Sequence, residues 1–227
     1  MRPKLLINCD LGESWLLQRS GRQREILALC DLANVCCAAH AGDRDLTRAT
    51  MAEAAEVGVR VGAHPGYPDP EHFGRRSLYR VSYDLDAIAQ IVAEQVALAI
   101  DAAAQEGLVL YHVKPHGALY NEAASDADVA AAIAEGVGRV APDLVLLGLA
   151  NSIMIDVFSS LGFAVLRESF ADRRYTAAGL LIPRSEPDAL IEDPVVARAQ
   201  TQLLASFSDT VCVHSDSRNA LALLAAI

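Results

Sequence analysis

Seven short runs of apolar residues recur along the chain, and within each run the apolar positions are nearly continuous rather than alternating with polar ones. Strands that are apolar on both sides fit a parallel sheet covered by helices, because a half-solvated antiparallel strand would alternate. The pattern therefore predicts seven parallel strands, at Leu5–Cys9, Leu32–Cys37, Val59–Ala63, Leu108–Val113, Leu144–Ala150, Phe163–Leu166 and Thr210–Val213.

Between these runs lie stretches whose apolar residues recur with helical spacing. The clearest is 84–106, where Leu85, Ile88 and Val92 fall on one face before Gly107 ends the helix. The other predicted helices are Gln23–Cys30, Arg44–Val57, Asp126–Val140, Ser152–Leu161, Pro194–Ser206 and Arg218–Ala226.

Alternating strands and helices with short connections predict right-handed βαβ crossovers and a parallel α/β fold. Seven such units can close into a barrel or wind into an open sheet, and periodicity alone does not choose between the two. The length of 227 residues fits one barrel-sized domain, residues 1–227. Two segments rich in glycine, proline and charge, Tyr67–Arg76 and Ala171–Pro187, are predicted to be long functional loops.

The composition narrows the classes of function. Twenty-nine acidic against nineteen basic residues give a formal charge of −10, which repels the phosphates of nucleic acids and of anionic membranes. The first apolar run is too short for a signal peptide or a membrane span. Five cysteines without a C-x-x-C pair fit a reducing compartment, and most fall in predicted strands, which favours buried cysteines over nucleophiles. We therefore expect a cytoplasmic protein that binds neither nucleic acid nor membrane.

Polar side chains follow the predicted strands at their C-terminal ends. In parallel α/β folds these ends share one face, so residues that are far apart in the sequence meet there. We expect the active site on this face. The residues concerned are Asp10, His64, Lys114, His116, Glu168 and His214.

Two segments near the N-terminus place acids and a histidine just after strands. Asp10 and Glu13 stand on either side of Gly12, where a carboxylate can bind a cation or act as a general base. A helix-capping or turn aspartate is the alternative. His40 lies among small residues before Asp43, which fits a ligand of a metal or substrate as well as it fits a packed histidine.

The segment Tyr111–Asn121 carries the richest chemistry. Lys114 and His116 leave a strand on the same side before proline and glycine end it. Together they can stabilise an oxyanion and transfer a proton, although Lys114 could instead pair structurally with Glu168. His112 lies inside the apolar run and is expected to be a hydrogen-bonded core residue.

Three further candidates stand near predicted strand ends. His64 is followed at once by Pro65 and Gly66, a turn that fixes the imidazole. Arg173, in a charged loop after a strand, could clamp a carboxylate or phosphate, whereas most charged loops are simply solvated. His214 closes the last strand and fits a site residue and a structural residue equally well.

Several blocks of the sequence, taken in order, resemble the 5-oxoprolinase A-subunit family, also called the LamB/YcsF family. The lysine-proline-histidine block at 114–116 is highly specific, and the blocks extend over nearly the whole chain. Three departures stand out: Ala38-Ala39 replaces the usual Gly-Phe, Ser215 replaces a glycine, and the stretch 202–209 is shorter. The matching blocks are Ile7–Ser14, His40–Asp43, Gly62–Asp69, Phe73–Arg76, His112–Asn121, Phe170–Arg173 and Cys212–His214, with Glu168, Tyr175, Gly179, Arg184 and Asp216.

The resemblance implies a seven-stranded β/α barrel similar to the glycoside hydrolase/deacetylase superfamily. It also implies ATP-dependent opening of 5-oxo-L-proline to L-glutamate, in a complex with subunits B and C. The sequence contains no recognised phosphate-binding loop, so it does not identify where ATP binds. On this hypothesis His64 or Asp10 orients or deprotonates the attacking water, and Lys114 neutralises the developing oxyanion. Arg173 holds a carboxylate or phosphate. His116 and Glu168 transfer protons to the ring nitrogen.

Other functions use the same residue types. A metal-dependent deacetylase or carbohydrate hydrolase of the same superfamily would need similar acids and histidines. A non-catalytic subunit that only binds the lactam would need no catalytic residues. A cysteine hydrolase is a more distant alternative. A divalent metal held by Asp10, His40 and His64 fits the ligand types, but spacing alone does not establish it.

Overall fold

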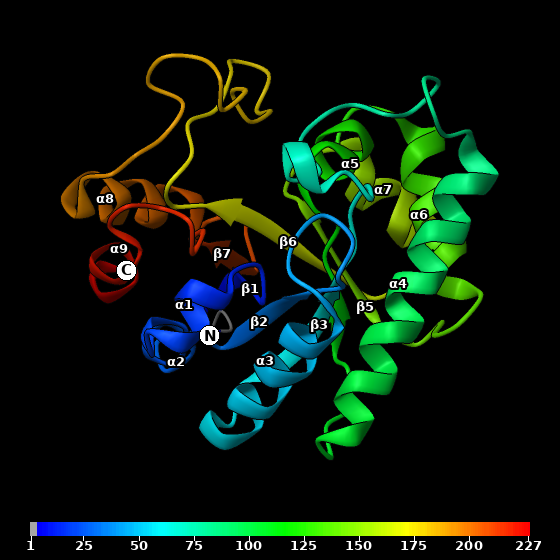
Figure 1. Ribbon diagram of the computed structural model, residues 1–227. Coiled ribbons are helices and arrows are strands. Elements are labelled where there is room, and N and C mark those ends of the chain that lie inside the picture. The colour runs from blue at the N-terminus through cyan, green and yellow to red at the C-terminus, as the bar shows by residue number, and fades with distance from the viewer. Residues whose placement is uncertain (1–3) are drawn as a thin grey trace.

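The computed structural model describes residues 4–227. Its seven strands form one closed parallel barrel in sequential order, with helices around the outside (Figure 1). Closure is made by the first and last strands, which pair with Leu6 opposite Thr210 and Asn8 opposite Cys212. The barrel is therefore confirmed and the open sheet is excluded. The strands are β1 Leu6–Leu11, β2 Leu32–Cys36, β3 Arg60–His64, β4 His112–Val113, β5 Val145–Leu149, β6 Val165–Phe170 and β7 Thr210–Cys212.

All seven predicted helices are present. Two short helices and a 3-10 turn were not predicted: α1, α5 and η1 each occupy a segment whose glycines and prolines indicate a turn. The helices are α1 Trp15–Arg19, α2 Arg22–Leu27, α3 Arg44–Val57, η1 Pro70–His72, α4 Leu85–Gln105, α5 Gly117–Ala123, α6 Ala127–Gly138, α7 Ile153–Ser160, α8 Pro194–Leu204 and α9 Ala220–Ala226.

Aspartates fix the starts of the long outer helices. The side chains of Asp43, Asp84 and Asp126 each accept a hydrogen bond from the first turn of α3, α4 and α6. Gly58 then ends α3 with φ 80°, a left-handed conformation that glycine adopts without strain. These local signals explain why the boundaries of the long helices agree closely with the sequence prediction.

Helix α4 is long and apolar enough to cross a membrane by length and composition alone. In the structure it lies on the outside of the barrel beside α3 and α6, and half of its apolar window is buried within the molecule. Ile88, Val92 and Val96 are fully buried there. The apolar face of α4 thus serves the barrel core.

Two strand boundaries differ from the prediction and move candidate residues. Strand β6 continues to Phe170, four residues beyond the predicted end, so Glu168 lies inside the strand rather than after it. Asp10 likewise lies within β1. Strand β4 is shorter than predicted because it begins at His112 rather than at Leu108, and it ends at Val113 as predicted.

The five cysteines are all free, and four of them are buried as expected: Cys9, Cys36, Cys37 and Cys212. Burial raises the pKa of the Cys37 thiol to about 12, and it also raises the pKa of Cys36. These thiols are therefore protonated at neutral pH and are poor nucleophiles.

Candidate active site at the C-terminal end of the barrel

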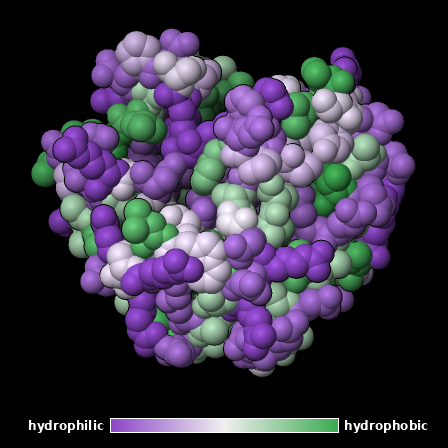
Figure 2. Space-filling model, in the orientation of Figure 1, coloured by the Kyte–Doolittle hydropathy of each residue, from purple (hydrophilic) through white to green (hydrophobic). Residues whose placement is uncertain are grey.

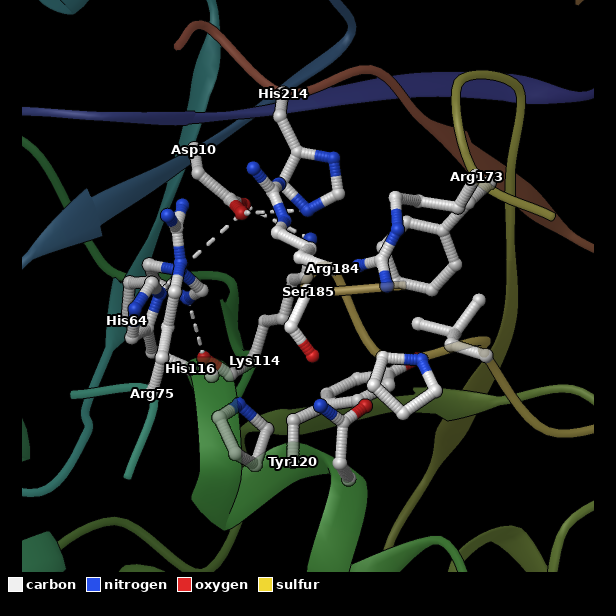
Figure 3. Close-up of a pocket in the computed structure, with 16 residues that line it drawn as sticks. Asp10, His64, Arg75, Lys114, His116, Tyr120, Arg173, Arg184, Ser185 and His214 are labelled. Atoms are coloured by element: carbon white, nitrogen blue, oxygen red, sulfur yellow. Dashed lines mark hydrogen bonds and ion pairs between the residues drawn. The ribbon is translucent and has the colours of Figure 1, made fainter. Parts of the chain in front are cut away.

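A cleft of about 350 Å³ opens at the C-terminal ends of the strands. In the space-filling view this face is hollowed between the loop that follows β6 and the part of the surface over α5 (Figures 1 and 2). The predicted loop Ala171–Pro187 supplies one wall through Arg173, Leu181 and Arg184. The predicted residues that line the cleft are Asp10, His64, Lys114, His116, Arg173 and His214 (Figure 3).

Lys114 stands at the floor of this cleft between two carboxylates. Its Nζ lies 2.8 Å from Asp10 Oδ1 and 3.0 Å from Glu168 Oε1, and all three side chains are at most 4% exposed. Burial disfavours the charge of Lys114, but Asp10 and Glu168 outweigh burial and raise the pKa of Lys114 well above its usual range. Conversely, burial would raise the pKa of Asp10, but His64 and Lys114 lower it well below its usual range. Lys114 and Asp10 are therefore both charged at neutral pH.

A hydrogen-bond chain beneath Lys114 holds Asp10 in place. Asn34 Nδ2 donates to Asp10 Oδ1 and to Asn8 Oδ1, at 2.8 Å each. His112 Nε2 lies 2.7 Å from Asn34 Oδ1 and must donate to it, since an amide oxygen only accepts. Burial, together with the charge of Lys114, lowers the pKa of His112 to about 3. His112 is thus a neutral, hydrogen-bonded core residue, as predicted.

His214 is oriented by an aspartate. Its Nδ1 lies 3.0 Å from both carboxylate oxygens of Asp172, and its backbone N–H donates to Asp172 Oδ2 at 2.9 Å. The ring also stacks on Phe170. In the neutral ring, Nδ1 carries the proton that Asp172 accepts and Nε2 presents a lone pair, 3.9 Å from Asp10 Oδ2. This arrangement is that of a general base held in one tautomer.

Arginines make the opposite wall cationic. Arg184 and Arg75 both pair with Asp216, whereas Arg173 is buried and has no carboxylate partner among residues 4–227. Its Nε has no hydrogen-bond partner in that same range. Burial, reinforced by the charge of Arg184, lowers the pKa of Arg173 to about 10, so it is still cationic at neutral pH. Such a wall can receive a carboxylate or phosphate.

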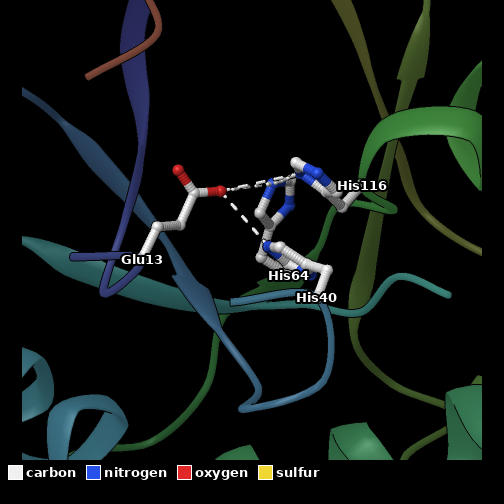
Figure 4. Close-up of side chains that lie close together, drawn as sticks. All are labelled: Glu13, His40, His64 and His116. Atoms are coloured by element: carbon white, nitrogen blue, oxygen red, sulfur yellow. Dashed lines mark hydrogen bonds and ion pairs between the residues drawn. The ribbon is translucent and has the colours of Figure 1, made fainter. Parts of the chain in front are cut away.

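A second cluster, Glu13 with His40, His64 and His116, lies beside the first (Figure 4). One ligand atom from each of the four residues falls within 4.8 Å of the others, which is close enough to hold a metal ion. Asp10, Cys212 and His214 form another such group. His64 belongs to both environments, because its Nε2 lies 3.4 Å from Asp10 Oδ2.

The structure separates the nine predicted site residues into three places. Six line the cleft. Glu168 lies below Lys114 and is fully buried, so it does not reach the cleft. Glu13 and His40 lie behind His116, with His40 completely enclosed. Ala38 and Ala39, which depart from the family pattern, do not line this cleft; they line a separate surface hollow with Arg44 and Ile91.

Several residues of the site were not among the predictions. Asp172 orients His214, and Asn34 orients Asp10. Tyr120 lines the cleft, where burial and the charge of Glu168 raise the pKa of its hydroxyl well above the usual range. Asp172 carried a signal, namely an acid just after a strand end, whereas Asn34 lies in mid-strand in an apolar run and carried none.

The fold and cleft together define a parallel β/α barrel enzyme with its site on the C-terminal face of the strands. The profile of the LamB/YcsF family matches residues 5–227, and the chain belongs to this family. It is 42% identical over 238 residues to the 5-oxoprolinase A subunit of Bordetella pertussis strain Tohama I, covering 97% of this chain and 92% of that protein. Identity to the 5-oxoprolinase A subunit of Bacillus subtilis strain 168 is 42% over 232 residues, covering 95% and 88%.

A solved structure is similar over the whole fold. The lactam utilization protein from Thermus thermophilus superposes with a TM-score of 0.87 at 33% sequence identity, covering 99% of this chain and 96% of the other. The sequence-derived family assignment and the seven-stranded barrel are thereby confirmed.

Proposed function

We propose that this chain opens the lactam ring of 5-oxo-L-proline to give L-glutamate, as the A subunit of a 5-oxoprolinase. The observation that carries the proposal is a single cleft that combines an oriented base, His214 with Asp172, and a cationic wall containing Arg173. Its relatives that are named as A subunits of 5-oxoprolinase support this choice over other hydrolytic reactions.

The size and charge of the cleft suit this substrate. A volume of about 350 Å³ lies near the lower end of the roughly 300–1,000 Å³ of small-molecule sites, which fits a five-membered ring with one carboxylate. The carboxylate would pair with Arg173, whose buried guanidinium has no carboxylate partner among residues 4–227. This pairing would turn the lactam carbonyl toward Asp10 and His214.

Ring opening needs water to add to the carbonyl carbon, the carbon–nitrogen bond to break, and the nitrogen to gain a proton. His214 Nε2 takes the proton from water and returns it to the ring nitrogen, while Asp10 orients the water. The Lys114 protons face Asp10, Glu168 and Cys212, at 2.8, 3.0 and 3.1 Å, so its main role is to hold Asp10. This changes the roles expected from the sequence for Lys114 and Glu168: both are positioning residues.

The nucleotide fits this cleft less well than the lactam does. When bound, ATP would supply the phosphoryl group that makes the lactam carbonyl more electrophilic. The arginine wall fits one anionic group, but a cleft of about 350 Å³ is small for a whole nucleotide, and the sequence contains no phosphate-binding loop. We therefore place the ATP site on the partner subunits B and C. A cytoplasmic location, where ATP is present, belongs to the same proposal.

The test is reconstitution with subunits B and C, following ATP-dependent release of glutamate. Arg173 and its neighbour Arg174 provide a matched pair, because the first is buried in the cleft wall and the second is exposed. Removing a charged hydrogen-bond partner costs about 1.5–3 kcal/mol, so Arg173→Gln should raise KM for 5-oxoproline about 10- to 100-fold. Arg174→Gln should leave KM within about twofold. Equal effects of the two variants, or no lactam opening by the wild-type complex, would refute the proposal.

A further inference from the structure

The rings of His64 and His116 point a nitrogen atom at each other, with His64 Nε2 only 2.9 Å from His116 Nδ1. His64 Nδ1 lies 2.7 Å from the backbone oxygen of Lys114, and His116 Nε2 lies 2.9 Å from that of Phe73. Carbonyl oxygens only accept hydrogen bonds, so both of these nitrogens must carry a proton. In the neutral rings the remaining nitrogens, His64 Nε2 and His116 Nδ1, are therefore both lone pairs, and they lie only 2.9 Å apart.

Two lone pairs at this separation repel each other unless a proton or a metal ion lies between them. We propose that His64 Nε2, His116 Nδ1 and Glu13 Oε1 bind one divalent transition-metal ion of the zinc class. Histidines that ligate metals usually donate their other N–H to a carbonyl or carboxylate, and both rings do so here. Two imidazoles and a carboxylate are the ligand types that such ions prefer.

The separations between the ligand atoms fit one ion. With bonds of about 2.0–2.2 Å, two ligands of the same ion stand about 2.9–3.5 Å apart, depending on the angle between them. The observed separations are 2.9 Å between the two nitrogens, and 3.6 and 4.0 Å from Glu13 Oε1 to His116 and His64. Of the three ligand atoms, only Glu13 Oε1 would have to move closer to the ion.

His40 is excluded as a ligand, although it belongs to the same cluster. Its ring stacks on that of His116 with centroids 3.7 Å apart and planes within 2° (Figure 4). The lone pairs of parallel rings point along parallel planes and cannot meet at one ion. His40 Nε2 instead lies 3.2 Å from Glu13 Oε1, so His40 positions the carboxylate and the His116 ring.

The open side of this site faces the cleft. His64 and His116 line the cleft together with Asp10, whereas Glu13 does not. An ion held there would supply a Lewis acid beside the lactam carbonyl, a role that Lys114 does not fill. This last point rests on the proposed function, but metal binding itself does not and can be tested independently of turnover.

The test measures metal content of the purified full-length chain after chelation and reloading with Zn²⁺ or Co²⁺. We expect one equivalent of metal, retained through gel filtration, with visible absorption from bound Co²⁺. His64→Asn and His116→Asn should weaken binding at least about 100-fold, and Glu13→Gln about 10-fold or more. His72→Gln, which changes a half-exposed histidine outside the cluster, is the matched control and should bind like the wild type.

Two results would overturn the proposal. One is a folded wild-type chain that takes up no metal, which would mean that the two nitrogens share a proton instead. The other is metal binding that survives in Glu13→Gln and in both histidine variants with circular dichroism unchanged, which would place the metal elsewhere. The first result is measured on the wild-type chain, so the proposal can be refuted even if one of the variants fails to fold.

Discussion

The two lysines of this chain stand at opposite ends of the barrel. Lys4 precedes β1 and pairs with Asp31 at 3.1 Å, with its side chain 76% exposed. Lys114 follows β4 and pairs with Asp10 and Glu168, with its side chain 2% exposed. A lysine–aspartate ion pair is therefore exposed to solvent at the N-terminal end of the barrel and buried at the C-terminal end.

This difference separates stability from function. At the N-terminal end, exposed pairs such as Arg167 with Asp209 join neighbouring strands and gain little, because water screens them. At the C-terminal end, charges are removed from water, which is costly unless each has a partner. A protein that only needed a stable barrel would fill this end with apolar side chains. The retained buried charges indicate that this end carries the chemistry.

The largest expected effect is on the free energy of unfolding of Lys114→Met. Removing one partner of a buried ion pair leaves Asp10 and Glu168 uncompensated, which should cost about 3–5 kcal/mol. Lys4→Met removes an exposed pair and should cost less than about 1 kcal/mol. Urea unfolding of both variants measures the difference. Similar losses of unfolding free energy in the two variants would contradict the difference between the buried and the exposed ion pair.

The second expected effect concerns two histidines that contact an aspartate through Nδ1 at the same distance of 3.0 Å: His214 with Asp172, and His72 with Asp69. His214→Gln removes the proposed base and should lower kcat about 10²- to 10⁴-fold in the reconstituted complex. His72→Gln lies outside the cleft and should keep kcat within about twofold. Full activity of the His214→Gln enzyme would show that His214 is not the general base.

A smaller effect is expected for Asp209→Asn at the N-terminal end, and it should depend on pH. Asp209 accepts hydrogen bonds from the side chain and backbone of Arg167, and these lower its pKa. The resulting stability is present above the unfolded-state pKa, about 3.9, and is lost as pH falls through the lower folded-state value. Asp209→Asn should cost less than about 1 kcal/mol at pH 7, with no effect on kcat.

Thermal unfolding at pH 7 and near pH 2.5 measures this dependence. The stability difference between Asp209→Asn and the wild type should shrink at the lower pH. A constant difference would mean that the carboxylate charge contributes nothing there.

The sequence was informative wherever local chemistry decides the structure. Continuous apolar runs identified all seven strands. Polar residues at their ends identified five residues that line the cleft, and the charged loop after the sixth strand added Arg173. It was uninformative where contacts across the barrel decide. Nothing local distinguished the inward-facing Asn34, which binds Asp10, from its apolar neighbours. Glu168 was predicted to lie after a strand because Arg167 ended the apolar run before it, yet Glu168 faces Lys114 from inside β6.

The most direct test of the account compares Asp10→Asn with Asp31→Asn in the complex reconstituted with subunits B and C. Both aspartates pair with a lysine, one at each end of the barrel. The quantity measured is ATP-dependent glutamate release at saturating 5-oxoproline. We expect a loss of at least about 100-fold for Asp10→Asn and a change of less than about twofold for Asp31→Asn. Full activity of a folded, assembled Asp10→Asn complex would contradict it.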